Sequence, residues 1–219
     1  MKIKVSVSVL ICSLLLSTFN SVAQGTVRLG PYLGFGFREM RGNSSIGQGG
    51  TFQFGLLGEV SLNDKAGLLP LISYVQKGGH TFEGYFLDYY SSDLRLNYFS
   101  VSLPLKWKAD KNFFFLGGIQ GGVLLGAEYA EEGQENIFFG SGQHTASEGN
   151  AMRKFHALDL GITAGMGFQF RNGMGIDLRT DFGLIRSARR DVDEPEFAGS
   201  NFTLMMGYFI LIKTKKAEG

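Results

Sequence analysis

The stretch that decides the fold is FHALDLGITAGMGFQFRNGMGIDLRTDFGL, residues 155–184. Within 158–170, apolar side chains occupy every second position. The residues between them are small or polar: Asp159, Gly161, Thr163, Gly165, Gly167 and Gln169. This alternation is typical of a β-strand with two chemically different faces. The Arg171-Asn172-Gly173 segment predicts a tight turn, because Asn and Gly tolerate positive φ, and the alternation resumes at Met174. The stretch therefore predicts a long β-hairpin with one apolar face and one face of glycine and charge.

The same pattern, with a period of two residues, extends over the rest of the chain. Beyond the hairpin it predicts six further strands, at about 27–38, 51–62, 67–77, 98–107, 113–126 and 202–212. In the strand at 67–77 nearly every residue from Leu68 to Val75 is apolar, so its two faces cannot be assigned. With the two strands of the hairpin, the sequence predicts eight strands.

The predicted connections alternate between long and short. Long loops are expected at 39–49, 78–93, 127–153 and 186–196, and short turns at 63–65, 109–112 and 171–173. Outer-membrane barrels show this asymmetry, with short periplasmic turns and longer extracellular loops. We therefore predict an all-β fold, an eight-stranded antiparallel transmembrane β-barrel with an up-and-down meander topology. Its long loops would face outward from the cell, and both termini would lie in the periplasm.

A soluble barrel of the lipocalin type would show the same period, with its apolar residues inside. Two features argue against it. The apolar face carries almost no charge, and the opposite face is dominated by glycine instead of the lysine and glutamate of a solvated surface. Glycine suits the narrow interior of an eight-stranded barrel, and Phe, Leu and Ile suit lipid. Trp107, Phe170 and Tyr208 also fall near the expected periplasmic strand ends, where an aromatic girdle belongs. We therefore favour the membrane barrel.

The first residues have the organisation of a secretory signal peptide. A basic start and an apolar core at 5–16 are followed by small residues that predict cleavage before Gln24. Cys12, the only cysteine, lies in that core, so the mature chain would offer neither disulfides nor thiolate chemistry. The expected organisation is a signal peptide at 1–23, an outer-membrane β-barrel at 24–213 and a C-terminal periplasmic tail at 214–219.

The composition excludes two other classes of protein. A formal net charge of +1 gives no electrostatic case for binding nucleic acid. After residue 24 no apolar run reaches the roughly 18 residues that a membrane-spanning helix needs. The 32 glycines and 20 phenylalanines, together with the alternation, favour an all-β barrel instead.

Eight ionisable residues fall on the predicted inward face. They are Arg28, Arg38, Lys106 and Arg179 with Glu59, Asp159, Asp177 and Asp181. One interpretation is an ion pathway or a catalytic carboxylate pair. The other, which we favour, is a network of ion pairs that closes the lumen, because unpaired buried charges are costly and paired ones are tolerable. The Asp177-x-Arg179-x-Asp181 segment is expected at the centre of that network.

Some eight-stranded outer-membrane barrels modify lipid A, so an enzyme has to be considered. A hydrolase of that kind needs a histidine beside a serine nucleophile. His80 and His144 fall in predicted loops, and no hydroxyl stands two residues after His156. A solvated acidic loop is a simpler hypothesis than a weak divalent-cation patch at the carboxylates Glu131, Glu132 and Glu135. We expect no catalytic residue, no metal site and no cofactor.

The hairpin and the predicted strand at 98–107 resemble a known family. The run GMGFQFRNGMGIDLRTDFGL at 165–184 resembles the final hairpins of the PorT-like outer-membrane β-barrel family. Tyr98, the apolar residues after it and Lys106 are similar to that family's strand pattern. The family's proline four positions after the tyrosine is Ser102 here, and Pro104 follows on the same face. The resemblance implies an eight-stranded outer-membrane barrel. The founding member is linked to protein secretion, but no residue of this chain carries that link over.

These patterns favour a monomeric outer-membrane protein with a structural or surface-interaction role through its long loops. The alternatives are a narrow porin, another transport or secretion-associated barrel, and a lipid A-modifying enzyme. The expected partners are the lipid bilayer and the barrel assembly machinery, while the extracellular ligand or secretion partner is not identified by any motif. One aromatic cluster fits either a recognition surface or the outer membrane interface, which we favour: Tyr85, Phe86, Tyr89 and Tyr90.

Overall fold

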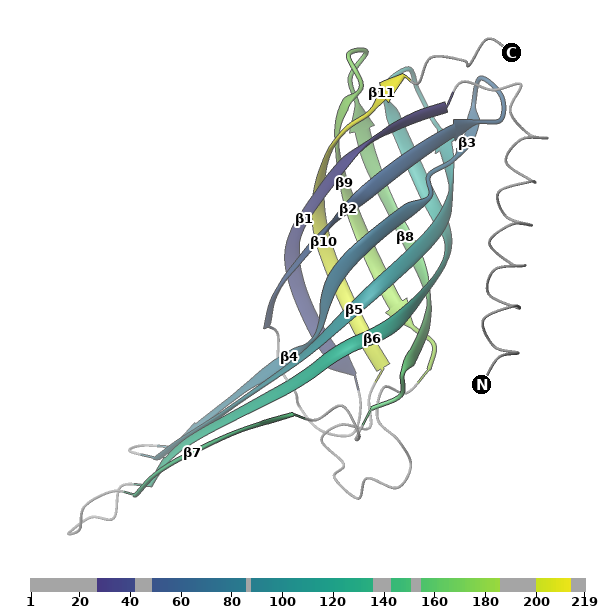
Figure 1. Ribbon diagram of the computed structural model, residues 1–219. Helices are drawn as coiled ribbons and strands as arrows, with labels where there is room; N and C mark the ends of the chain where they lie inside the picture. The colour runs from purple at the N-terminus through teal and green to yellow at the C-terminus, as the bar shows by residue number, and fades with distance from the viewer. Residues whose placement is uncertain are drawn as a thin grey trace, which may run out of the picture.

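The computed structural model describes residues 27–41, 49–85, 88–135, 143–150, 155–185 and 200–213. The expected signal peptide with Cys12, the tail at 214–219 and the predicted loop at 186–196 lie outside this part. So do residues 42–48, 86–87, 136–142 and 151–154, which lie within or beside the other predicted long loops. In the described part, no helix is long and apolar enough to cross a membrane. The structure there consists of antiparallel strands that close on themselves (Figure 1).

Eleven strands build this sheet in the described part of the chain; ten of them fill eight positions around a ring, and β7 lies off the ring and pairs only with β6. The strands are β1 (Val27–Arg41), β2 (Gly49–Ser61), β3 (Ala66–Leu68), β4 (Leu71–Tyr85), β5 (Asp88–Lys108), β6 (Phe113–Glu135), β7 (Gln143–Asn150), β8 (Leu158–Gln169), β9 (Met174–Gly183), β10 (Ser200–Ile210) and β11 (Ile212–Lys213). β3 and β4 share one wall position between β2 and β5, and β10 and β11 share one beside β1. Pairing of β1 with both β2 and β10 closes the ring. The predicted eight-stranded antiparallel barrel is confirmed.

The turn between β8 and β9 has the conformation that its sequence predicts. Phe170 N donates to Met174 O at 2.8 Å, and Gly173 N donates to Phe170 O at 3.1 Å. Gly173 has φ +90°, in the left-handed region that a side chain disfavours. The Asn172 side-chain oxygen accepts from Met174 N at 3.1 Å, which fixes the entry into β9. Asn-Gly at this position therefore sets the register of the hairpin.

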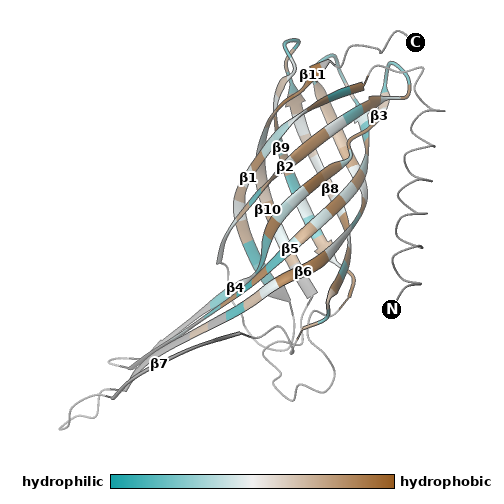
Figure 2. Ribbon diagram, in the orientation of Figure 1, coloured by the Kyte–Doolittle hydropathy of each residue, from teal (hydrophilic) through white to brown (hydrophobic). Residues whose placement is uncertain are grey.

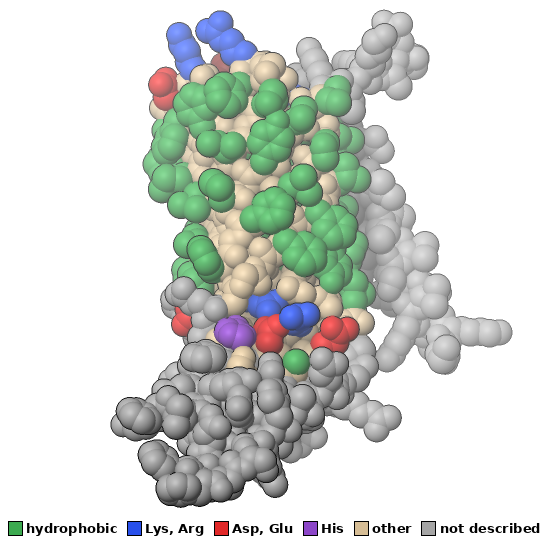
Figure 3. All heavy atoms as spheres, turned by 90° about the vertical axis from the view of Figure 1, so that its left-hand side faces the viewer, with side chains coloured by type: hydrophobic (Ala, Val, Ile, Leu, Met, Phe, Trp, Pro, Cys, Tyr) green, Lys and Arg blue, Asp and Glu red, His purple; other side chains and the backbone are tan. Residues whose placement is uncertain are grey.

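The two faces of the strands are oriented as the alternation predicts. Large apolar side chains point outward and are strongly exposed; Phe35 and Ile119 are each 66% exposed, and Met206 is 65% exposed. Brown segments recur along the barrel strands in Figure 2, and apolar side chains cover the face of the wall that Figure 3 shows. Val60 is an exception to the outward set, because it is only 5% exposed. The polar residues of the opposite face are buried inside, so the sheet faces lipid with its apolar side.

A charge placed on this apolar face should destabilise the barrel according to its depth. Ile119 lies midway along the barrel part of β6 between Phe113 and Leu125, and Leu125 lies nearer the long-loop end. We expect Ile119→Lys to lower the free energy of unfolding by about 2–4 kcal/mol, and Leu125→Lys by about 0–1 kcal/mol. Urea unfolding in lipid vesicles, followed by fluorescence of the single tryptophan Trp107, measures both. Equal losses at the two positions would contradict the outward orientation of this strand relative to lipid.

Two predicted loops are wrong, because strands continue through them. β4 extends to Tyr85 and β5 starts at Asp88, within the loop expected at 78–93. β6 extends to Glu135, and β7 forms within the loop expected at 127–153. The predicted strand at 67–77 is likewise divided into β3 and β4. The segments at 81–93 and 128–150 lack alternation, because alternation is required only where one face of a strand meets lipid. Their sequence therefore predicts no strand.

Beyond the barrel, β4 to β7 form a narrow sheet that projects from the long-loop end (Figure 1). We call this the outer sheet and define it as residues 81–85, 88–93, 128–135 and 143–150. Its strand order is β4-β5-β6-β7, with Tyr85 paired to Asp88 and Glu135 paired to Gln143. Part of what the sequence presents as loop is therefore a regular antiparallel sheet.

Apolar side chains also fill part of the interior, which the sequence analysis missed. Two clusters of buried residues occur inside the barrel. The first, towards the outer sheet, contains Val75, Leu94, Leu96, Tyr98, Leu124, Ala127, Phe155 and Met205, and the second, towards the short turns, contains Tyr32, Leu57, Leu69, Leu71, Phe114, Leu116, Phe209 and Leu211. Inward glycines make room for the larger rings; a Cβ at Gly175 would overlap Phe209. The glycine face therefore accommodates aromatic side chains from neighbouring strands.

Candidate functional site

The predicted inward charges lie in three separate groups along the barrel. One group lies at the short-turn end, one in the middle, and one at the rim that leads into the outer sheet. Each group is held by residues from strands far apart in the sequence, because β1 closes on β10 and strand order follows the ring.

At the short-turn end, Glu59 and Lys106 form a fully buried ion pair. Lys106 Nζ donates to Glu59 Oε1 at 2.7 Å and to Gln169 Oε1 at 2.5 Å. Gln169 Nε2 donates to Glu59 Oε2 at 3.3 Å, and Arg28 Nε lies 3.2 Å from the same oxygen. The Lys106 ammonium also lies 4.5 Å from the centroid of the Phe114 ring. Both oxygens of Glu59 are thus engaged, which is the condition under which a buried ion pair is tolerable.

In the middle of the barrel, Arg179 and Asp177 pair on the same strand. Arg179 Nη2 donates to Asp177 Oδ2 at 3.0 Å, and the Tyr32 hydroxyl donates to Asp177 Oδ1 at 3.1 Å. The guanidinium lies over the Tyr32 ring, with Cζ 5.2 Å from the centroid. Arg179 is 1% exposed, and its Nε and Nη1 make no hydrogen bond. The face of the Tyr32 ring therefore stabilises part of the guanidinium charge, in addition to the single carboxylate of Asp177.

A second pair at this depth links Lys77 to Asp159. Lys77 Nζ donates to Asp159 Oδ2 at 2.7 Å, and the two side chains are 2% and 4% exposed. With the Gln120 amide oriented so that its nitrogen faces Asp181, Gln120 donates to Asp181 Oδ2 at 3.1 Å and accepts from Lys77 at 3.2 Å. Asp181 thus joins this pair through Gln120, whereas its Oδ1 makes no hydrogen bond. Arg179 makes its ion pair with Asp177 and not with Asp181.

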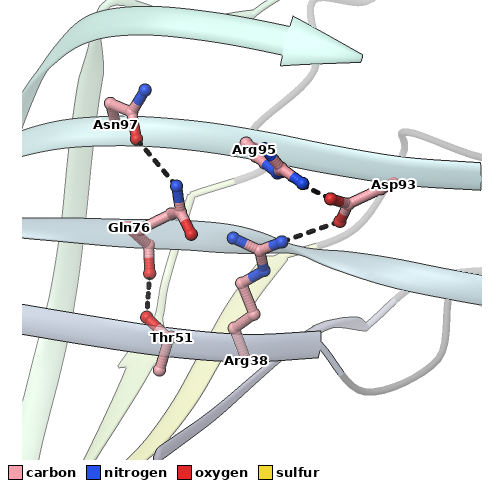
Figure 4. A network of polar contacts seen from close by, with 6 residues as sticks. All are labelled: Arg38, Thr51, Gln76, Asp93, Arg95 and Asn97. Atoms are coloured by element: carbon pink, nitrogen blue, oxygen red, sulfur yellow. Dashed lines mark hydrogen bonds and ion pairs between the residues drawn. The ribbon is translucent and has the colours of Figure 1, made fainter. Parts of the chain in front are cut away.

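At the rim, Arg38 crosses from β1 to β5 (Figure 4). Arg38 Nη2 donates to Asp93 Oδ1 at 2.7 Å, and Arg95 Nε donates to Asp93 Oδ2 at 2.6 Å. The β2–β4 ladder ends at Gln53 and Val75, and beyond it the Thr51 hydroxyl donates to the Gln76 carbonyl. Arg38 therefore bridges the wall where the ladder between β2 and β4 has ended.

The structure adds ionic partners that the sequence analysis missed. Lys77 fell in the strand whose faces could not be assigned, and Asp93 fell in a predicted loop. The alternation does place Tyr32, Gln120 and Gln169 on the inward polar faces. It does not show which inward residues of different strands contact each other across the barrel. The Asp177-x-Arg179-x-Asp181 segment lies in the middle group, as one of several pairs and not as a continuous ladder.

The histidines and carboxylates considered above as catalytic or metal-binding candidates lie only partly within the described residues. Among the described residues, no group of three His, Cys, Asp or Glu side chains could hold a metal ion. His156 is exposed two residues before β8 begins, and His80 is half-buried in β4. The side chains of His144, Glu131, Glu132 and Glu135 lie outside the described set, as do those of the aromatic cluster at 85–90. What the interior can do is hold opposite charges together across the barrel.

A closed antiparallel barrel with an apolar exterior and a filled, polar interior defines the class of outer-membrane β-barrels. This chain belongs to the family of the outer membrane protein beta-barrel domain, whose model matches residues 20–189. It is therefore a protein of the cell outer membrane, surrounded by a lipid bilayer.

Solved structures of similar fold come from several bacteria. The attachment invasion locus protein Ail of Yersinia pestis, in complex with the heparin analogue sucrose octasulfate, is 14% identical with a TM-score of 0.45, over 86% of this chain and 99% of Ail. Neisserial surface protein A is 11% identical with a TM-score of 0.46, over 84% of this chain and 96% of its own. The N-terminal barrel of Pseudomonas aeruginosa OprF is 11% identical with a TM-score of 0.37, over 86% and 98%. A search of curated proteins finds no match.

Proposed function

We propose that this protein is a surface-display barrel, in which a closed transmembrane wall anchors the outer sheet and the outer sheet contacts an extracellular partner. The observation that carries this proposal is the continuation of β4, β5 and β6 past the barrel, where β7 joins them. Ordering a polar sheet outside the membrane costs conformational entropy, and a sheet that only connected strands would need far fewer residues.

The interior supports this function over transport. Ion pairs at three levels and two apolar clusters occupy the barrel between the short turns and the rim. We propose that the eight predicted charges, together with Lys77 and Asp93, keep the lumen shut. Eight strands leave an interior only wide enough for side chains to fill. A filled lumen favours a surface role over a narrow porin, and the absence of a catalytic constellation in the described part favours it over an enzyme.

Several further properties belong to this proposal. The signal peptide at 1–23, the barrel at 24–213 and the periplasmic tail at 214–219 follow from the sequence pattern, as does insertion by the barrel assembly machinery as a monomer. Within the family, the hairpin sequence at 165–184 suggests the PorT-like group. The founding member of that group is linked to protein secretion. An alternative is therefore that the outer sheet contacts a component of a secretion machine.

Planar-bilayer recordings test the closed lumen. We expect the purified protein to give no steady conductance, because charged and apolar side chains fill the interior. The variant Arg179→Gly with Tyr32→Gly, which removes two large side chains from the middle group, should conduct if it remains folded. Folding is checked by heat-modifiable migration on a gel. Steady channels in the unmodified protein would overturn the closed barrel and favour transport.

Surface display is tested on cells. We expect Ser147→Cys in β7 to react with a membrane-impermeant maleimide on intact cells, and Asp64→Cys in a short turn to react only after permeabilisation. Cells carrying the full outer sheet are then compared, for retention on immobilised extracellular polypeptides, with cells whose outer sheet is replaced by two short turns. Equal retention by the two strains, with both barrels folded, would overturn the interaction role.

A further inference from the structure

The outer sheet carries ionic residues of one sign. Six carboxylates lie on its strands beyond the rim, and two more, Asp93 and Glu128, lie at its base beside Arg38 and Arg95. The six are Glu83, Asp88, Glu131, Glu132, Glu135 and Glu148. None of the residues 81–85, 88–93, 128–135 and 143–150 is lysine or arginine, although the whole chain has a formal net charge of +1. The acidic character is therefore a property of this sheet and not of the protein.

The strand register brings these residues close together. Glu131 and Glu132 on β6 are paired with Ser92 and Ser91 on β5, and Glu148 on β7 is paired with Ala130. Neighbouring strands lie roughly 4.8 Å apart, so backbone positions that bear carboxylates on adjacent strands fall within the Debye length of about 8 Å at physiological salt. The sheet thus presents a concentrated negative potential outside the membrane, which attracts cations and repels polyanions.

The outer sheet also has an open edge that is regular. All eight residues of β7, Gln143–Asn150, pair with β6, and no described strand pairs with the other edge of β7. The free edge of β4 is different, because Gly78 at its base has φ +115° and interrupts regular strand geometry. β7 contains neither proline nor lysine, the residues that commonly block an exposed edge. No described strand therefore pairs with the N–H and C=O groups on this edge, and another extended chain can form a ladder with them.

We propose that the outer sheet binds an extended polypeptide segment rich in lysine or arginine, which adds as a strand along the free edge of β7. This inference rests on the proposed surface role and names its class of partner. Backbone hydrogen bonds to β7 would provide affinity, as in other cases of strand addition. The carboxylates would select a cationic segment and speed its association. A metal ion or a small cation satisfies the charge but leaves the edge unused, and a sulfated glycan is repelled.

The test uses the full barrel in lipid nanodiscs and synthetic fluorescent peptides. The probe is an eight-residue peptide of alternating lysine and threonine, which favours the extended conformation. Two controls isolate the two parts of the proposal: a glutamate–threonine peptide reverses the charge, and the lysine–threonine peptide methylated at every backbone nitrogen keeps the charge but cannot donate ladder hydrogen bonds. We expect the lysine–threonine probe to bind at least about tenfold more tightly than either control, and binding to weaken as salt rises from about 50 to about 300 mM.

Two variants make the outcomes distinct. A charge-neutral sheet, in which all six carboxylates beyond the rim are replaced, should lose about tenfold or more in affinity while its barrel keeps heat-modifiable migration. The replacements are Glu83→Gln, Asp88→Asn, Glu131→Gln, Glu132→Gln, Glu135→Gln and Glu148→Gln. A barrel with the outer sheet replaced by short turns should not bind the probe. Undiminished binding by the charge-neutral sheet, or no binding by the native protein, overturns the cationic partner but leaves surface display intact. Equal binding of the N-methylated probe overturns strand addition. Equal binding by the shortened barrel places the interaction elsewhere and also removes the support of the outer sheet for the proposed function.

Discussion

Replacing Arg179 with methionine should lower the free energy of unfolding of the barrel by about 3–5 kcal/mol, because it leaves Asp177 buried without the cation with which it pairs. Asp177 is 3% exposed and would keep only the Tyr32 hydroxyl as a hydrogen-bond donor. Methionine has a similar length, so the loss of packing volume is small and the loss of charge dominates. Urea unfolding in lipid vesicles, followed by Trp107 fluorescence, measures the change.

Two further variants show whether the loss comes from the buried charge. Arg171→Met changes the same residue type in the exposed turn before β9 and should have an effect within about 0.5 kcal/mol. Asp177→Asn combined with Arg179→Met should recover part of the stability, because the unpaired carboxylate is removed together with the guanidinium. If Arg179→Met unfolds at the same urea concentration as the unmodified protein, the middle ion pair does not stabilise the barrel.

Replacing Gly175 with valine should destabilise the barrel by about 1–3 kcal/mol through overpacking of the interior. A Cβ at this position would overlap the Phe209 ring and would lie 2.8 Å from the Phe168 carbonyl oxygen. Phe209 is 1% exposed and packs against Phe114 at a centroid distance of 6.4 Å, so it has little room to move. The same unfolding measurement reports the loss.

Gly117→Val is the matched control, because a Cβ at Gly117 meets nothing within 4 Å and the residue is exposed on the outer wall. Valine favours strands and suits lipid, so we expect no loss of stability at that position. Phe209→Ala should partly rescue Gly175→Val by vacating the space that the new side chain needs. Equal effects of valine at 175 and at 117 would show that inward glycines are not needed for the aromatic interior.

Part of the fold is predictable from sequence for a simple reason. A strand that crosses lipid must place apolar side chains on one face and bury the other, so the hairpin at 158–183 shows its faces in every second residue. The outer sheet escapes this requirement, since both of its faces lie outside the membrane. Its residues at 81–85, 88–93, 128–135 and 143–150 therefore carry no period, and their sequence predicts loops.

The ion pairs show a second limit. Alternation placed Arg28, Glu59 and Lys106 on the inward face, but it did not show that Lys106 and Glu59 meet from β5 and β2 at 2.7 Å. Which inward residues meet depends on the stagger between strands around the ring, and that stagger is a property of the closed sheet. Lys77 was missed because the apolar run before it, from Leu68 to Val75, hides the parity of β4.

The sequence by itself determined that this chain crosses the outer membrane as a barrel, which residues face lipid on most strands, and where the β8–β9 turn forms. These features follow from local chemistry: a period of two residues, a turn with positive φ, and the absence of charge on one face. Only the tertiary structure decided which charges pair, that apolar clusters share the interior with them, and that three strands continue outside and form an acidic sheet with a fourth. Those features depend on register and closure, which bring together residues that no local pattern relates.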